Sequence, residues 1–206
     1  MITLHHLNNS RSQRILWLLE ELGVEYDIKH YQRDAVTSLA PPELQAIHPL
    51  GKSPVVSDGE EVLAESGMII DVLARRYGPQ LSPDFTSLDY PQYMHWLHFA
   101  EGSAMTPFLL ALYTGRLGDA AAPLRPRIMS EITNHLSYVE GHLAGKTYFV
   151  GERLTGADIA MSFIGEIAKA QGQLSAMPHT SAWLEICHAR PQWQAALIKG
   201  GPYNYA

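Results

Sequence analysis

Residues 53–66 read SPVVSDGEEVLAES. The two short apolar runs on either side of Asp58-Gly59 predict a β-hairpin, because this dipeptide favours the tight turn that joins antiparallel strands. Glu65 and Ser66 then begin a helix that is expected to end at Tyr77, just before a glycine. A unit of two strands and one helix cannot bury its apolar face alone, so it must pack against other strands.

The residues before this unit alternate strand and helix signals. Strands are predicted at residues 2–6 and 25–31. The helix between them can be capped by Ser10 or Ser12 and is expected to end at Gly23. A short helix beginning at a pair of prolines follows. The order β-α-β and then α-β-β-α predicts a small α/β domain with a mixed sheet.

The composition changes after this domain. Residues 78–84 are rich in Gly, Pro and polar side chains, which is typical of a linker between domains. Beyond the linker, strand signals nearly vanish and residues 88–113 have helical character. Pro107 lacks a backbone N–H, so it is expected to kink or divide this helix.

Further helices follow. One carries an apolar stripe at three- and four-residue steps, formed by Ile128, Ile132, Leu136, Val139 and Leu143. Others are predicted at residues 155–170 and 180–190. The expected fold class is therefore α/β plus all-α, with an α/β domain at residues 1–79 and an all-helical domain at residues 87–206.

The helix predicted at residues 155–170 has the strongest local signal. Thr155 and Asp158 have the spacing of a capping box, and Leu154 and Ile159 flank it as a hydrophobic staple. Because the cap satisfies the carboxylate of Asp158, we expect this residue to stabilise the fold rather than to act in catalysis.

Composition excludes several classes of protein. The 206 residues carry a formal net charge of −6 without a run of Lys or Arg, which argues against binding of nucleic acid. A single cysteine, Cys187, excludes an internal disulfide, and the ten histidines lack metal-ligand spacing, so no metal is expected. The start of the chain does not resemble a secretory signal, and no apolar stretch is long enough to span a membrane. We therefore expect a cytoplasmic protein without membrane contact.

Two segments could hold a charged ligand. Residues 7–14 carry hydroxyl, amide and guanidinium groups between the first strand and the first helix, where α/β folds bind ligands. Glu65 and Ser66 lie at a helix N-terminus, which favours an anion, while the Glu65 carboxylate can hold an ammonium group. An α-amino acid carries both charges at that spacing. In each segment, the simpler interpretation is a serine that only caps a helix.

A third segment, residues 50–56, could bind an extended peptide. Pro54 cannot donate to a strand ladder, so it is expected at an edge or a turn. If the Ser53–Pro54 peptide bond were cis, Val55 would present a free backbone N–H and C=O for strand addition. The sequence by itself favours trans, because few X–Pro bonds are cis.

Taken in order along the chain, these segments resemble the glutathione transferase family. The resemblance extends from residue 2 to about residue 193, and residues 50–56, 65–66 and 155–158 are its most specific parts. The first loop and the proline-rich segments are most similar to the bacterial and fungal branch near the yeast Gtt-type transferases. The resemblance implies a thioredoxin-like N-terminal domain, an all-helical C-terminal domain, a homodimer and a cis peptide bond before Pro54.

The resemblance also implies how glutathione is bound. Lys52 would lie near the glycine carboxylate, and Val55 would pair its backbone with the cysteinyl part. Glu65 and Ser66 would hold the ammonium and carboxylate of the γ-glutamyl group. The full set of expected glutathione-binding residues is Lys52, Ser53, Pro54, Val55, Glu65 and Ser66.

Ser10 falls where serine-type members of the family place the hydroxyl that stabilises the thiolate. The mechanisms that use tyrosine or cysteine are not available, since no tyrosine precedes Tyr26 and the first loop has no cysteine. Asn9 and Arg11 flank Ser10, and either could supply the main contact to sulfur. The expected catalytic residues are therefore Ser10, Asn9 and Arg11.

The implied activity is that of an enzyme of detoxification, a glutathione S-transferase that uses glutathione as co-substrate and attacks a small hydrophobic electrophile. Candidates for the wall of the electrophile site are Met105, Phe108, Leu109, Leu112 and Tyr113, although core packing is the simpler interpretation of these residues. Peroxide reduction, dehalogenation and isomerisation with glutathione stay open, as does a non-catalytic binding module. In the expected homodimer, Glu101 would reach toward the glutathione amine of the partner subunit.

Overall fold

The computed structural model describes all residues, 1–206. Its N-terminal part is built on a four-stranded sheet in the order β2-β1-β3-β4. The central strand β1 (Ile2–Leu7) runs parallel to β2 (Tyr26–Tyr31) and antiparallel to β3 (Val55–Asp58), which forms the predicted hairpin with β4 (Glu61–Ala64). The mixed sheet expected from the sequence is therefore confirmed.

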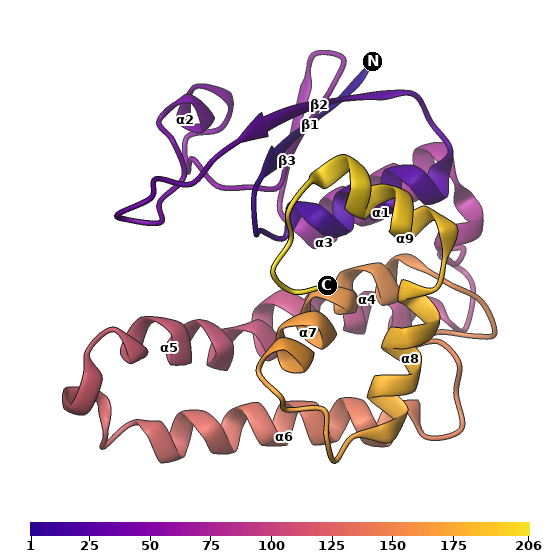
Figure 1. Cartoon of the computed structure of the whole chain (residues 1–206). Helices are drawn as coiled ribbons and strands as arrows, with labels where there is room; N and C mark the ends of the chain where they lie inside the picture. The colour runs from indigo at the N-terminus through magenta and orange to yellow at the C-terminus, as the bar shows by residue number, and fades with distance from the viewer.

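Three helices accompany the sheet, namely α1 (Ser12–Leu22), α2 (Glu43–Ile47) and α3 (Ser66–Tyr77). Helices α1 and α3 lie together on the face of the sheet that looks toward the rest of the chain, whereas α2 lies apart from them (Figure 1). Gly23 ends α1 as predicted: with φ of 64° it donates its N–H to the carbonyls of Leu19 and Glu20. The order of elements and the sheet are those of a thioredoxin-like domain.

The remainder of the chain contains no strand, as expected. Its elements are η1 (Pro79–Leu81), α4 (Tyr90–Phe99), η2 (Ala100–Ala104), α5 (Met105–Gly115), η3 (Gly118–Ala121), α6 (Arg125–Leu143), α7 (Gly156–Ala170), α8 (Pro178–His188) and α9 (Pro191–Gly200). The apolar stripe predicted on α6 is confirmed, because its five members are the buried residues of that helix. None of the helices combines the length and the apolar character needed to cross a bilayer.

The interruption expected at Pro107 lies a few residues earlier. Residues 100–104 form a π-helical turn, and α5 begins at Met105. Pro107 is thus the third residue of α5, directly after the π turn. The π turn lets one helical rod continue past the proline.

The capping box at the start of α7 is confirmed. Thr155 accepts a hydrogen bond from the Ala157 N–H, and Asp158 accepts the Thr155 N–H in return. The fully buried Asp158 carboxylate also accepts bonds from the Phe149 N–H and the Trp183 indole. It therefore joins the cap of α7 to the preceding loop and to α8. Burial raises its pKa to about 6, although these donors lower it.

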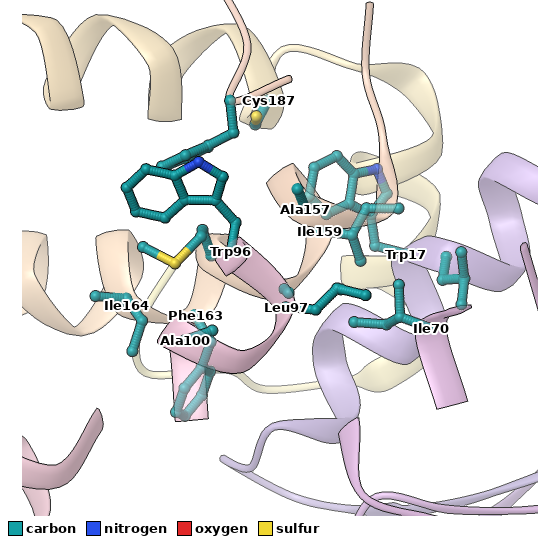
Figure 2. Packing of buried hydrophobic residues seen from close by; sticks show 14 of the residues in the cluster. Trp17, Ile70, Trp96, Leu97, Ala100, Ala157, Ile159, Phe163, Ile164 and Cys187 are labelled. Carbon is teal, nitrogen blue, oxygen red and sulfur yellow. The ribbon is translucent and has the colours of Figure 1, made fainter. Parts of the chain in front are cut away.

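One apolar core of 43 buried residues runs through both halves of the molecule. Figure 2 shows Trp17 and Ile70, from the sheet-bearing half, next to Ile159 and Leu97 from the helical half. Gly156 makes this contact possible, because a Cβ there would lie 2.6 Å from Ile70 and 2.8 Å from the Tyr93 hydroxyl. The two halves therefore pack as one body, which places the start of α1 against the helical half.

Helix α9 was not predicted from the sequence. It packs closely on α1, and a Cβ at Gly200 would come within 2.4 Å of Gln13 Oε1, so the Gln13 side chain would have to shift. The residues after α9, 201–206, turn back and run between the two halves to the level of α7 (Figure 1). We call residues 201–206 the C-terminal tail.

Candidate active site

The register of the sheet gathers the predicted ligand-binding segments at one edge. His5 of β1 lies opposite Val55 at the start of β3, and Val55 lies opposite Ala64 at the end of β4. The first loop (residues 8–11) follows β1, so it shares this edge with Lys52–Pro54 and with Glu65–Ser66. Strand β2 also ends here, because Leu7 pairs with Tyr31 in the parallel ladder.

The hydroxyl of Ser10 is buried and bonded within the chain. Its Oγ accepts the Ser12 N–H at 3.2 Å and lies 2.8 Å from the Ser12 hydroxyl, and the side chain is 4% exposed. Asn9 has a positive φ of 48°, and its Oδ1 accepts the N–H of Asn204 from the C-terminal tail at 2.8 Å. The start of α1 has no other side-chain cap. Ser10 therefore holds the turn into α1.

A buried histidine extends this network. His6 Nδ1 lies 2.9 Å from the Ser12 hydroxyl, which can also donate to the Leu7 carbonyl at 3.3 Å. Burial, together with the nearby His30, lowers the pKa of His6 to about 4, so the ring is neutral at pH 7. A neutral ring donates from one nitrogen only. The tautomer of His6 therefore decides which way the Ser12 and Ser10 hydrogens point.

Arg11 belongs to a charged cluster between the first loop and the helical half. Its Nε lies 2.9 Å from Glu101 Oε2, and the other Glu101 oxygen accepts a hydrogen bond from the buried Arg14. Arg14 also donates to the Ala160 carbonyl at 2.6 Å. Burial lowers the pKa of Arg11, while Glu101 opposes the shift. Glu101 is thus paired with two arginines of its own chain, and its expected approach to the glutathione of a partner subunit stays a prediction.

The segment before β3 differs from expectation in one respect. The Ser53–Pro54 bond is cis, as the resemblance implies. The expectation of a free backbone at Val55 is wrong, because β3 is an interior strand: Val55 pairs with His5 on one side and Ala64 on the other, and it is 1% exposed. The open end of the strand is Ser53, whose hydroxyl donates to the His5 carbonyl at 2.9 Å. Lys52 beside it is exposed.

Glu65 and Ser66 lie at the helix start that the sequence predicts. Helix α3 begins at Ser66, which is buried, and Glu65 is exposed with a φ of 73°. No side chain caps this helix. The alternative interpretation, in which the Ser66 hydroxyl is an N-cap, is therefore not supported. The N–H groups of the first turn are left for a ligand or water.

The candidates for the electrophile wall separate into two groups. Met105 and Phe108 are core residues, and Leu109 is half-buried. Leu112 and Tyr113, further along α5, are exposed, and Tyr113 at 58% is close enough to Arg11 to raise its pKa. Only the end of α5 therefore remains a candidate wall.

Cys187 is not part of the site. It lies in α8 with its thiol fully buried among the residues of the core (Figure 2). Burial raises the pKa of the thiol well above its usual value. The protonated form is a poor nucleophile and a poor metal ligand. No group of three or more His, Cys, Asp or Glu side chains is arranged so that it could hold a metal ion.

Two hollows lie away from the site. One, of about 370 Å³, lies between Glu21, Tyr148 and Arg190, and the other, of about 380 Å³, is lined by His95, Phe99, Glu131, Asn134, His135 and Tyr138. Neither includes a predicted site residue. The predicted residues instead lie at the edge of the sheet where β1 ends.

Comparison with known proteins identifies relatives over the whole chain. The family model described as glutathione S-transferase, N-terminal domain, matches residues 1–75, and the corresponding C-terminal domain model matches residues 102–191. The chain is 38% identical over 216 aligned residues to glutathione S-transferase 3 of Schizosaccharomyces pombe, covering 97% of this chain and 88% of that protein.

A solved structure and a different kind of relative complete the comparison. A glutathione S-transferase from Actinobacillus pleuropneumoniae superposes with a TM-score of 0.88 at 39% identity, covering 99% of this chain and 94% of that one. A probable elongation factor 1-gamma 1 of Arabidopsis thaliana is 27% identical over 161 residues, which are 77% of this chain but 38% of that protein.

Proposed function

Because the chain belongs to the glutathione S-transferase family, we propose that it joins the sulfur of glutathione to the electrophilic atom of a small hydrophobic compound. The observation that carries this proposal is the register that gathers three ligand-binding segments at one sheet edge. Glutathione has an α-amino acid end, a thiol and a glycine carboxylate. Each segment offers groups suited to one of these parts.

The α-amino acid end is assigned to the start of α3. Its uncapped N–H groups and the Ser66 hydroxyl suit the γ-glutamyl carboxylate, and the exposed Glu65 carboxylate suits the ammonium. The exposed Lys52 is assigned to the glycine carboxylate. We assign the cysteinyl part to the backbone between them, at Ser53 and Pro54, with Val55 already paired in the sheet.

Ser10 is assigned to the sulfur as hydrogen-bond donor. A free thiol has a pKa of about 8.5, so ionising it at pH 7 requires a shift of about two units, or roughly 2.7 kcal/mol. A hydrogen bond to a charged group supplies about 1.5–3 kcal/mol, but Ser10 must first give up its neutral bond with Ser12, which is worth about 1 kcal/mol. The net gain corresponds to about one pKa unit.

The second unit must come from other groups. The N-terminus of α1 contributes about 0.3–1 kcal/mol to a nearby anion. Arg11 contributes more, because its Nε is engaged by Glu101 while the rest of the guanidinium is left for a ligand. Asn9 has an amide nitrogen to offer, since its oxygen is occupied by Asn204. We therefore propose that Ser10 and Arg11 share the stabilisation of the thiolate and that Asn9 plays the smaller part.

The test measures the ionisation of bound glutathione. Ser10→Ala should still bind glutathione, but thiolate absorbance titrated against pH should show the bound thiol's pKa raised by about one unit. Arg11→Ala should also raise it, and Ser137→Ala, on the exposed face of α6, is the matched control. If the thiol of bound glutathione has the same pKa in Ser10→Ala as in the parent protein, Ser10 does not stabilise the thiolate and only holds the turn into α1.

The same site could carry out other glutathione-dependent reactions in place of the proposed transfer. Peroxide reduction, dehalogenation and isomerisation use the same thiolate, so a panel of aryl halides, epoxides, enals and hydroperoxides separates them. The match to an elongation factor favours a second candidate, a non-catalytic module. Such a module would show no ionised thiol and no conjugation, whether or not it is retained on immobilised glutathione.

We also propose a homodimer located in the cytoplasm, acting in detoxification without a metal, membrane or nucleic acid partner. We keep residues 1–79 and 87–206 as the boundaries of the glutathione-binding domain and the helical domain. The family models support a division in this region, because one ends at residue 75 and the next begins at residue 102.

A further inference from the structure

We propose that the electrophile carries a carboxylate or a similar anionic group, bound by Arg33 where the first loop meets the C-terminal tail. This inference rests on the proposed function, because it concerns the second substrate of the same site. A site of this kind selects its second substrate by charge as well as by size, whereas a purely hydrophobic site would not distinguish an acid from its ester by charge.

The order of the strands separates the two substrates. Arg33 follows β2, whereas the segments assigned to glutathione adjoin β3 and β4. Strand β1 and its first loop lie between them in the order β2-β1-β3-β4. Sulfur placed at Ser10 therefore has glutathione on one side and Arg33 on the other. The carboxylates of glutathione already have partners on their own side, in Lys52 and the start of α3.

Arg33 is fixed beside the first loop. It donates from Nε to the Asn8 carbonyl at 3.1 Å, from Nη2 to the Asn9 carbonyl at 3.3 Å and from Nη1 to the Ser38 carbonyl at 3.0 Å. Its backbone N–H also donates to Asn8 Oδ1. Three of the five guanidinium hydrogens are thus used on neutral carbonyls, and two remain. No carboxylate of the chain forms an ion pair with it.

Arg33 has a second cation, Arg11, as a neighbour. Burial and the neighbouring Arg11 lower the pKa of Arg33, while Tyr205 and Tyr113 oppose the shift. Arg11 cannot supply a counter-charge, and it already shares Glu101 with Arg14. A half-buried cation without a partner is costly unless a ligand provides the anion. Arginine is suited to this task because its planar fork matches a carboxylate.

The C-terminal tail adjoins this site, because it bonds to the same residue, Asn9, as Arg33 does. Asn204 anchors the tail to Asn9, and the Tyr205 ring stands edge-on to Phe163 at 5.7 Å. The Arg11 guanidinium lies 5.8 Å from the centre of the same Phe163 ring. Tyr203 donates its hydroxyl to Glu166, but no such bond holds Tyr205. The flat part of a substrate can therefore lie against aromatic rings while its anion faces Arg33.

The experiment compares two aryl halides that differ in one charge, 4-chloro-3-nitrobenzoate and its methyl ester. For each, kcat/KM is divided by the rate constant of the uncatalysed reaction with glutathione, because the two compounds differ in intrinsic reactivity. We expect the parent protein to favour the acid by at least tenfold on this measure. Arg33→Met should abolish the preference by lowering the value for the acid only, with KM for glutathione unchanged.

Two further variants test whether a loss of preference in Arg33→Met comes from the missing charge or from a disturbed first loop. Tyr205→Phe removes one hydroxyl from the tail and should reduce the preference for the acid two- to fivefold. Arg127→Met, on the exposed face of α6, removes an equal charge elsewhere and should leave the preference intact.

Two outcomes overturn the inference. The first is an ester used as well as the acid by the parent protein. The second is an Arg33→Met protein whose KM for glutathione rises equally with both compounds, which would make Arg33 part of the glutathione site. A failure of the proposed function looks different, since neither compound would then be conjugated and bound glutathione would show no thiolate.

Discussion

Replacing Asp158 by alanine should severely destabilise the protein without changing its affinity for glutathione. The carboxylate accepts four hydrogen bonds: from the Phe149 N–H at 2.9 Å, the Trp183 indole at 3.0 Å, and the N–H and hydroxyl of Thr155 at 2.9 and 3.2 Å. Alanine leaves three of these donors, all N–H groups, buried without a partner, while the Thr155 hydroxyl can rotate.

The expected loss follows from these three donors. An unsatisfied buried donor costs about 1–3 kcal/mol, and water entering the vacated space can satisfy part of the deficit. We therefore expect a loss of about 3–5 kcal/mol, near the upper end of what a single substitution causes. For a chain of this length, a loss of that size lowers Tm by roughly 10 °C.

Urea and thermal unfolding followed by circular dichroism measure this loss. Asp119→Ala, at an exposed position of the short helix η3, is the matched control and should change stability by less than about 0.5 kcal/mol. Glutathione binding by the folded fraction of Asp158→Ala should equal that of the parent. The reasoning fails if Asp158→Ala loses less than about 1 kcal/mol, or if activity disappears while stability is retained.

Three further predictions follow from the site and the core. Glu65→Ala and Ser66→Ala should each raise KM for glutathione with a smaller change in the thiol's pKa, because both residues are assigned to the end of glutathione remote from sulfur. If KM is unchanged in both variants, glutathione binds elsewhere. Cys187→Ala should keep activity within about tenfold of the parent, and the thiol should react with iodoacetamide only on unfolding, because it is buried; rapid labelling of the native protein would contradict this. Light scattering at micromolar concentration should give the mass of a dimer, and a monomer would refute the homodimer.

Much of the fold can be predicted from the sequence because it depends on interactions between residues close along the chain. Gly23 ends α1 because a left-handed conformation follows the last helical residue, and only near neighbours take part. The capping box from Thr155 to Asp158 and the Asp58-Gly59 turn are equally short in range. The apolar stripe of α6 needs only helical periodicity to be recognised.

The errors arose where the outcome depends on distant partners. Val55 looked like an edge position until the pairing on both sides of β3 was known. The interruption assigned to Pro107 became a π turn ahead of it, which keeps the rod in contact with α6 and α7. Helix α9 has only a weak apolar face of its own. It packs on α1, which lies near the other end of the sequence, so no local pattern predicts the contact.

By itself the sequence determined the two-part fold, the segments that converge at the end of β1 and the family that they resemble, because turn, cap and periodicity signals act between residues close along the chain. Only the tertiary structure decided that Glu101 pairs with Arg11 and Arg14, and that the tail reaches Asn9 from the far end of the chain. These contacts have no local signature. They depend on how two packed halves bring remote side chains into a low-dielectric interior, where each charge or donor must find a partner.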